Sequence, residues 1–434
     1  MHITIHRGTH QIGGSCVELK SGDSRIILDI GMPLTDEYGR KFEIKNYRQL
    51  KEQELVKKGV LPDVAGLYYW SNSQKVDAAL ISHPHLDHYG LWEYVDPSIP
   101  FYMGPKARKI IELEIMTPSG RKNVARATDF MSSKSIDIGP FAVTPYLVDH
   151  AAYDSHALVV QAEGKTVIYS GDLRMHGHIP QATKYFLEHT PKGSDTLLLE
   201  GTMMGARSDE RCRSEKELET GFEAVFRKTK SIVLVYCSVQ NMDRIASIYR
   251  AAKRAGRTVV TDIYGAEVFN AVWKLENQKD MANIVKAMRV FYPYSLAQML
   301  GTRNPALLRK YAGLQIKSEE IRKRAKELVM LVRPKMVDDL TIIGGMEKAD
   351  FIYSQWAGYK AEPDTARLLD FVKKKEMACH EIHTSGHADR QSLQKIVNKL
   401  KPKAIIPIHT ENPEGYKEFG VPVRRLQDGE EAEV

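Results

Sequence analysis

Cysteine is scarce in this sequence: four residues in 434, with no two close enough to form a CxxC pair. This excludes a disulfide framework and a thiolate zinc knuckle, and we expect all four thiols to be reduced and structural. Long apolar runs are also missing, since no segment reaches the length that crosses a bilayer. The first residues lack the charged start, apolar stretch and cleavage site of a secretory signal. We therefore predict a cytoplasmic protein.

The charge balance is only mildly basic, with 62 Lys and Arg against 55 Asp and Glu. A small excess favours a polyanionic partner only where it gathers on one face. The basic runs at 106–109, 121–122 and 322–324 are typical of solvated helix faces, and they bear on function only if a site independently requires phosphate. The length and the 43% hydrophobic content allow two cores, so we expect two domains.

The hydrophobic pattern predicts a β-rich N-terminal part followed by βαβ units. A βαβ pattern is typical of a parallel sheet, and it begins after Glu200 with a helix at 242–255 for which Asn241 is the expected N-cap. We also expect a basic helical tract at 311–337. Strands are predicted at 2–6, 13–19, 25–30, 76–82, 141–148, 155–161, 166–169, 196–200, 231–236, 258–261, 340–343 and 403–409.

The most specific motif is His83-Pro-His85-Leu-Asp87-His88, which follows the apolar strand at 76–82. In an extended backbone residues i and i+2 point the same way, so His83 and His85 can bind one ion, while the turn directs Asp87 and His88 toward a second. A single zinc ion with four ligands is the milder alternative. Histidines on a surface loop are the structural alternative, which this density of ligands disfavours.

This motif resembles the signature of the metallo-β-lactamase superfamily of dinuclear hydrolases. Three further segments match in order, namely Val148-Asp-His150, Tyr169-Ser-Gly-Asp172 and Pro407-Ile-His409, although each alone would more often be structural. Asp29 matches a residue that orients ligands without binding metal. The resemblance implies seven ligands: His83, His85 and His150 for one ion, Asp87, His88 and His409 for the other, and Asp172 as the bridge.

Imidazole and carboxylate donors suit zinc, with manganese as the alternative. The resemblance implies that the nucleophile is a metal-bound hydroxide, because the ion lowers the pKa of its water toward about 7. Ser170 and Ser385 lie near the motifs, but we find no Ser-His-Asp arrangement that would indicate a covalent intermediate.

The long segment between Asp172 and His409 resembles the β-CASP branch of this superfamily. The implied fold is an α/β metallo-β-lactamase αββα sandwich (1–204 and 366–434) with an inserted α/β β-CASP domain (205–365). Three motifs carry the resemblance: Leu199-Glu200-Gly-Thr202, His383-Thr-Ser-Gly-His387-Ala and Ile408-His409. The segment Ser354-Gln-Trp356-Ala-Gly358-Tyr359 also resembles a β-CASP segment, and we interpret Trp356 as mainly structural.

In this branch the histidine corresponding to His387 is the general acid that protonates the leaving oxygen, with Glu200 bonded to it and raising its pKa. Asp87 is expected to serve catalysis as well as metal binding. Contacts to RNA phosphate are expected from two segments, with ordinary turn chemistry as the alternative. Their residues are Ser238 and Asn241 in one, and His383, Ser385 and Gly386 in the other.

A histidine at position 409 is what the RNA-processing members of the branch show, so we predict a metal-dependent ribonuclease resembling ribonuclease J-like enzymes, acting on single-stranded RNA. Endonuclease and 5′-3′ exonuclease action stay open, as does the oligomeric state, a homodimer included. The chain ends soon after His409, so we expect no further C-terminal domain. The alternatives are a DNA nuclease of the same branch, a lactone or thioester hydrolase, and a non-catalytic RNA-binding subunit.

Overall fold

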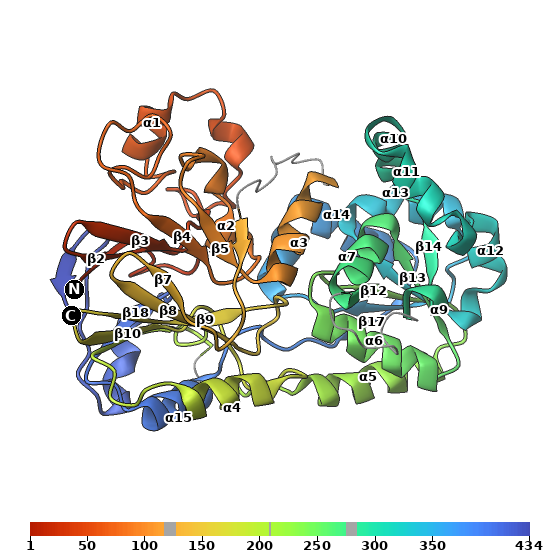
Figure 1. Cartoon of the computed structure of the whole chain (residues 1–434). Helices are drawn as coiled ribbons and strands as arrows, with labels where there is room; N and C mark the ends of the chain where they lie inside the picture. The colour runs from red at the N-terminus through yellow and green to blue at the C-terminus, as the bar shows by residue number, and fades with distance from the viewer. Residues whose placement is uncertain (117–126, 208–209, 275–283) are drawn as a thin grey trace. The chain divides into compact units, whose positions relative to one another are not determined.

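A computed structural model describes residues 1–116, 127–207, 210–274 and 284–434 (Figure 1). The chain divides into two compact units, of which the first comprises Met1–Glu112, Arg121–Arg211 and Gly386–Val434. The second comprises Leu113–Gly120 and Cys212–Ser385. It extends past the predicted domain boundary at residue 365 because the strand at 378–381 pairs with the sheet of the second unit.

The first unit contains two β-sheets. One is a mixed sheet of seven strands in the order β19-β1-β2-β3-β4-β5-β6. Its strands are β1 (His2–Arg7), β2 (Cys16–Ser21), β3 (Ser24–Leu28), β4 (Ala78–Ile81), β5 (Phe101–Met103), β6 (Ala127–Asp129) and β19 (Glu431–Glu433). The other has six strands in the order β18-β11-β10-β9-β8-β7. They are β7 (Ile136–Ile138), β8 (Phe141–Leu147), β9 (His156–Ala162), β10 (Lys165–Tyr169), β11 (Thr196–Glu200) and β18 (Ile405–Ile408).

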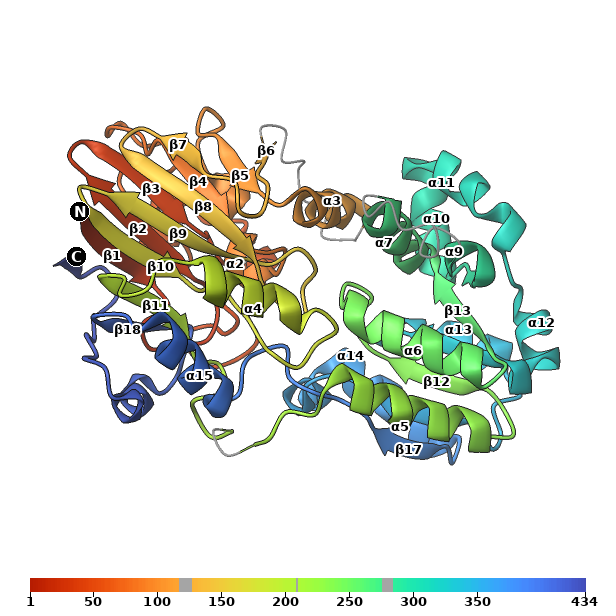
Figure 2. The ribbon, with the colours of Figure 1, turned by 60° about the horizontal axis from the view of Figure 1, so that its bottom comes forward.

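The two sheets pack face to face, and helices cover their outer faces. Side chains alternate along a strand, so Leu198 of β11 joins the core between the sheets while Leu197 and Leu199 join the outer core of the second sheet. On that outer face lie α4 (Pro180–His189) and α15 (Arg390–Leu400) (Figure 2). The outer core of the first sheet includes residues of α1 (Glu52–Lys57), α2 (Leu86–Tyr89) and α3 (Pro105–Leu113). These layers are those of the predicted αββα sandwich, and this fold prediction is confirmed.

The second unit is built on a parallel sheet in the order β14-β13-β15-β12-β16-β17. The strands are β12 (Val233–Tyr236), β13 (Thr258–Asp262), β14 (Arg289–Phe291), β15 (Leu328–Val332), β16 (Asp350–Tyr353) and β17 (Ala378–Glu381). The helices are α5 (Glu215–Lys228), α6 (Met242–Arg254), α7 (Ile263–Lys274), α9 (Ile284–Ala287), α10 (Tyr294–Arg303), α11 (Pro305–Lys310), α12 (Ser318–Lys323), α13 (Val337–Ile343) and α14 (Pro363–Lys374). Figure 2 shows α5 and α6 side by side, and α13 and α14 share a core with alternate residues of β12 and β16. Among the described helices, none is both long and apolar enough to cross a membrane.

Two predictions in this unit are wrong. Residues 340–343 end α13 rather than forming a strand, because Val337, Leu340 and Ile343 are buried at the three-residue spacing of one helix face. The tract at 311–337 is not continuously helical, since it contains the central strand β15, whose five residues are all buried. A short apolar run that is covered on both faces has no alternation to distinguish it from a helix. The predicted N-cap of α6 is confirmed, as the Asn241 side chain accepts from the Arg244 N–H.

Candidate metal centre

The predicted ligands of the first unit all follow the ends of strands. β10, β11 and β18 are parallel neighbours, so the residues after them emerge at one edge of the sheet. Asp172 follows β10, Glu200 ends β11 and His409 follows β18. From the other sheet, β4 leads into the segment with His83 and His85, and α2 carries Asp87 and His88.

Main-chain contacts fix the loop that carries the His83–His88 motif. The Ile30 N–H donates to the carbonyl oxygen of His88 at 2.8 Å, and the Ser15 N–H donates to that of Asp87 at 3.1 Å. Gly31 allows this approach, because a Cβ at that position would lie 1.7 Å from the Asp87 carbonyl oxygen. The ligand loop is therefore anchored on the segment that follows β3.

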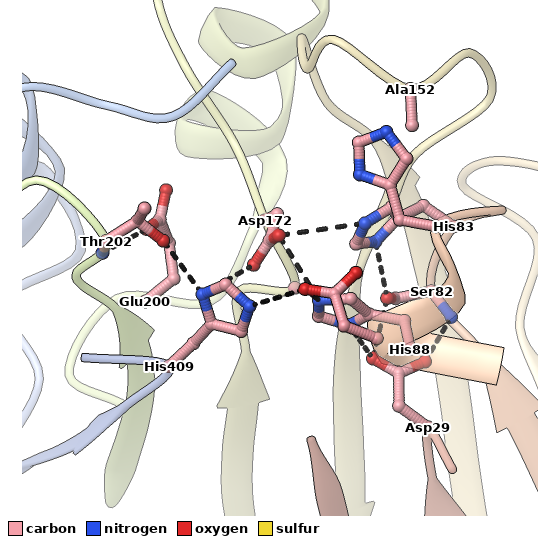
Figure 3. A network of polar contacts seen from close by, with 12 residues as sticks. Asp29, Ser82, His83, His88, Ala152, Asp172, Glu200, Thr202 and His409 are labelled. Atoms are coloured by element: carbon pink, nitrogen blue, oxygen red, sulfur yellow. Dashed lines mark hydrogen bonds and ion pairs between the residues drawn. The ribbon is translucent and has the colours of Figure 1, made fainter. Parts of the chain in front are cut away.

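The side chains of His83, His88 and His409 converge on the Asp172 carboxylate (Figure 3), and those of His85, Asp87 and His150 belong to the same groups of neighbouring donor atoms. Asp172 Oδ2 lies 3.2 Å from His88 Nε2, 3.6 Å from His83 Nε2 and 3.9 Å from His150 Nε2. Its Oδ1 lies 3.8 Å from His409 Nδ1. Among the described residues, three overlapping groups each lie close enough together to hold one cation: His83, His85, His150 and Asp172; Asp87, His88 and His409; and Asp172, Glu200, His387 and His409.

The donor atoms fit divalent metal. Ligand atoms about 2.1 Å from one ion, at tetrahedral angles, lie about 3.4 Å apart, close to the separations at Asp172. Among the described residues, the Nε2 atoms of His83 and His88 and both carboxylate oxygens of Asp172 are buried without a hydrogen-bond partner. Leaving such atoms unpaired is costly, and cations at the two positions would satisfy them.

Asp29 orients part of this cluster through hydrogen bonds. Its Oδ2 accepts from the Ser82 hydroxyl, the Tyr169 hydroxyl and His88 Nδ1, each at 2.7 Å, and its Oδ1 accepts from the Ser82 N–H at 2.7 Å. Because His88 Nδ1 then carries the proton, its Nε2 lone pair faces Asp172. The sequence indicated Asp29 for this role, but nothing in it singled out Ser82 or Tyr169.

Two other predicted ligands are held in the same way. His150 Nδ1 lies 2.6 Å from the Gly386 carbonyl oxygen, and His409 Nδ1 lies 2.8 Å from Thr202 Oγ1. Thr202 belongs to the Leu199–Thr202 motif, yet the sequence gave no reason to pair it with His409. Asp29 and His409 both adopt positive φ, 60° and 54°, a strained backbone conformation that clusters at functional sites.

The electrostatics favour the neutral form of His83, His85 and His150, whereas burial of His88 is outweighed by Asp172 and Asp29, which raise its pKa well above the usual value. Burial lowers the pKa of His83 and His150 well below the usual value and that of His85 to about 4. Burial opposes ionisation of Asp172, but the imidazoles of His409 and His88 outweigh it and hold its pKa well below the ordinary range. Neutral histidine and ionised aspartate are the metal-binding forms.

His387 lies beside this cluster with its ring Nδ1 toward two carboxylates, 3.5 Å from Glu200 Oε1 and 3.7 Å from Asp172 Oδ2. Burial lowers the pKa of His387, but Glu200 and Asp172 outweigh it, so its pKa is raised. Glu200 is fully buried and accepts from the N–H groups of Thr202, at 3.0 Å, and Ala388, at 3.3 Å. The pair predicted for acid catalysis is thus brought together.

The predicted phosphate contacts belong mostly to the second unit. Ser238 is exposed in the turn after β12, whereas the Asn241 side-chain oxygen caps α6 and the Gly386 carbonyl oxygen accepts from His150. His383 and Ser385 follow β17. Turn and cap chemistry therefore accounts for part of this set, and their contact with phosphate stays a prediction.

Sequence reasoning missed a buried ion pair in the second unit. The Arg244 guanidinium of α6 donates to both carboxylate oxygens of Glu215, at 3.1 and 3.0 Å, and both side chains are fully buried. Arg244 also donates to Ser354 Oγ at 2.5 Å and lies 3.5 Å from the carbonyl oxygen of Thr384. It therefore connects the first turn of α6 with the segments after β16 and β17.

Comparisons with known proteins agree with this geometry. Residues 62–219 match the model of a beta-lactamase superfamily domain, and residues 374–414 match that of a Zn-dependent metallo-hydrolase RNA specificity domain. A protein of unknown function from Enterococcus faecalis V583 has the same fold, with a TM-score of 0.80, 23% identity and 99% coverage of both chains.

Curated relatives are ribonucleases J. That of Sinorhizobium meliloti is 24% identical over 86% of this chain and 65% of its own length. That of Helicobacter pylori is 23% identical over 100% of this chain and 60% of its own length. The chain thus spans about three fifths to two thirds of these relatives. With its ligand motifs in order at the strand ends, its four-layered first unit and its second α/β unit, the chain is similar to the metallo-β-lactamase superfamily, and residues 62–219 match the model of a beta-lactamase superfamily domain.

Proposed function

We propose that this protein is a metal-dependent ribonuclease that hydrolyses the phosphodiester bonds of RNA. The observation that carries the proposal is the cluster of five histidines and two aspartates around Asp172, with the pair His387 and Glu200 beside it. A cluster of this kind serves hydrolysis by water, and no side chain is needed as the nucleophile.

The residues would hold two divalent cations, with Zn²⁺ preferred and Mn²⁺ as the alternative. One site uses His83, His85 and His150, and the other uses Asp87, His88 and His409, with Asp172 between them. When bound, the cations supply an acidic water and neutralise charge on the phosphate. Asp29, Thr202 and the Gly386 carbonyl fix which nitrogen of each imidazole faces the site.

His387 is the proposed general acid for the leaving oxygen. Glu200 is held by two main-chain N–H groups and faces His387 Nδ1, which favours the protonated ring. An imidazole with a pKa near or above neutrality can deliver a proton to an alkoxide that forms as the P–O bond breaks. Glu200 thereby acts through His387 and needs no contact with the substrate.

RNA is the proposed substrate, in single-stranded form. The RNA specificity domain model covers residues 374–414, which include both His387 and His409, and the relatives described above are named ribonuclease J. Ser238, Asn241, His383, Ser385 and Gly386 are the proposed phosphate contacts. A DNA nuclease is the second candidate, because a site that cleaves phosphodiester bonds does not by itself distinguish ribose from deoxyribose.

The test is to incubate RNA labelled at its 5′ or 3′ end with purified protein, with and without chelator, and to run a matched DNA strand in parallel. We expect RNA cleavage that chelator abolishes. A ladder dominated by mononucleotides would identify an exonuclease, and internal fragments an endonuclease. Cleavage of DNA but not RNA would overturn the substrate assignment, and RNA cleavage unaffected by chelator would overturn the mechanism.

Substitution of ligands tests the same centre. His85→Ala and Asp172→Asn should each abolish cleavage while circular dichroism shows an intact fold. The matched control is His189→Ala, since His189 lies on α4 and bonds within its own helix to the Tyr185 carbonyl oxygen. Full turnover in either ligand variant would exclude the proposed site.

A further inference from the structure

Trp356 does not pack as the sequence analysis expected. Its side chain follows β16 and is 47% exposed, and Tyr359, three residues later, is 38% exposed. Trp356 therefore does not lie in the core, and its interpretation as a mainly structural residue stays a prediction. The two rings lie edge to face, with centroids 5.4 Å apart and an interplanar angle of 88°. Binding residues are disproportionately common on such loops, and aromatic rings offer a large and rigid contact surface.

The indole is held rigidly from one side. A Cβ built on Gly358 would lie 2.3 to 2.7 Å from three consecutive atoms of its six-membered ring, so the glycine main chain lies against one ring face. The Trp356 carbonyl oxygen accepts from the Tyr353 hydroxyl at 2.8 Å and from the Tyr359 N–H at 3.1 Å. With one face covered by Gly358, the exposed part of the indole includes the other face.

Trp356 follows β16 at the carboxyl edge of the parallel sheet, which is where ligands bind in α/β proteins. β16 lies between β12 and β17. The Ser354 N–H donates to the Tyr236 carbonyl oxygen at 2.9 Å, and the Ser354 hydroxyl donates to the Ile382 carbonyl oxygen at 2.5 Å. The segment that carries Trp356 therefore starts between the turn with Ser238 and the segment with His383.

The buried pair of Arg244 and Glu215 fixes this edge. Arg244 reaches Ser354, two residues before Trp356, as well as the Thr384 carbonyl oxygen. The first turn of α6 and the segments that follow β16 and β17 thus share one buried support, and such preorganisation limits the entropy lost when a ligand is bound.

We infer that Trp356 is a stacking platform for an unpaired base of the RNA, with Tyr359 as its edge support. The inference rests on the proposed ribonuclease function and adds a base contact to the phosphate contacts proposed on either side. Bases of single-stranded RNA are recognised by stacking on aromatic rings, with little dependence on sequence.

A base fits this patch better than a protein does. The two rings are flanked by Gln355, Lys360 and Glu362, whereas a stable protein interface buries about 800 Å² on each partner. Lys360 Nζ lies 5.0 Å from the centre of the Tyr353 ring and 2.5 Å from Glu381 Oε1. Polar and charged residues thus adjoin the two exposed rings along the chain.

The test uses a single-stranded RNA of ten nucleotides and a series in which one position at a time lacks its base but keeps its sugar and phosphate. Binding is measured by fluorescence anisotropy in the Asp172→Asn background, so that the RNA stays intact. The variants are Trp356→Ala, Trp356→Phe and Gly358→Ala, whose methyl group would displace the indole without removing it. The control is Tyr185→Ala, which removes an aromatic ring of similar exposure, 45%, from α4.

With Trp356 present, loss of the base at one or two positions should weaken binding about 5- to 150-fold. In Trp356→Ala and Gly358→Ala the intact RNA should bind that much more weakly, and removal of the same bases should have no further effect. Trp356→Phe should recover part of the affinity, and Tyr185→Ala should keep the full pattern of base dependence.

Two results would overturn the inference while leaving the proposed function intact: base dependence that persists in Trp356→Ala, or an equal loss of affinity for every RNA in the series. Unchanged RNA binding with altered self-association would instead assign Trp356 to a protein contact. Failure of the Asp172→Asn protein to bind any RNA, with no cleavage by the unsubstituted protein, would refute the proposed function itself.

Discussion

The Asp29→Asn substitution tests whether Asp29 orients the proposed metal ligand His88 without binding metal itself. Asp29 is fully buried, and its Oδ2 accepts from Ser82, Tyr169 and His88. Asparagine has the same shape and tolerates the positive φ of this position. With its amide nitrogen facing these three donors, the hydroxyls of Ser82 and Tyr169 can rotate to accept. His88 can accept only by moving its proton from Nδ1 to Nε2, the nitrogen that faces Asp172.

The expected loss of metal affinity follows from the change in which nitrogen of His88 carries the proton. Loss of a carboxylate behind a metal-bound histidine costs about 10- to 100-fold in metal affinity, or about 1.4 to 2.8 kcal/mol. A hydrogen bond to a charged group contributes about 1.5 to 3 kcal/mol, which agrees. If the asparagine rotates instead, its amide faces the Ser82 N–H, and a buried donor is left unpaired at a similar cost.

The assay is a titration of metal-free protein with Zn²⁺ against a chromophoric chelator. We expect two equivalents in the unsubstituted protein, and in Asp29→Asn one equivalent bound 10- to 100-fold more weakly. Asp195→Asn is the control, because Asp195 accepts from the Thr166 N–H and pairs with Lys403 in the same unit. Unchanged affinity for both equivalents in a folded Asp29→Asn protein would refute the role assigned to Asp29.

Three further predictions concern metal, the ion pair of the second unit and the general acid. Removal of metal should lower Tm by about 5 to 10 °C, since saturation at 100 times Kd contributes about 2.7 kcal/mol; an unchanged melting curve with chelator would contradict binding at Asp172. Arg244→Met should lower the free energy of unfolding by about 3 to 5 kcal/mol because the buried Glu215 carboxylate loses its charged partner. The double variant Arg244→Met, Glu215→Leu should cost less, and urea denaturation compares the two. His387→Ala should slow cleavage about 10²- to 10⁴-fold with unchanged metal content, whereas loss of metal, measured by atomic emission, would make His387 a ligand.

The parts of the site that could be predicted are those in which a short motif follows a recognisable strand. His83-Pro-His85-Leu-Asp87-His88 brings four donors together within one loop, and the direction of the strands places Asp172 and His409 at the same sheet edge. The partners that orient these ligands could not be predicted. Tyr169 and Thr202 reach Asp29 and His409 across 140 and 207 residues of chain, and no local pattern encodes such a contact.

For elements that are covered on both faces, the sequence could not predict whether they form a helix or a strand. In β15 every residue is buried, so the sequence shows no alternation of apolar and polar residues, and helix and strand could not be told apart. For Trp356 the residue type favours the core, and only the tertiary structure shows that Gly358 lies against one ring face while the residue is 47% exposed.

The amino-acid sequence alone determined the order of the ligand motifs, the chemistry of their donors and the alternation of sheets and helices, because these depend on residues that are neighbours along the chain. Only the tertiary structure decided which nitrogen of each imidazole faces Asp172, which carboxylate faces His387 and which aromatic ring is exposed. Those features depend on contacts between segments that are distant in sequence, and the hydrophobic burial that joins the segments is not specific to any one pair of residues.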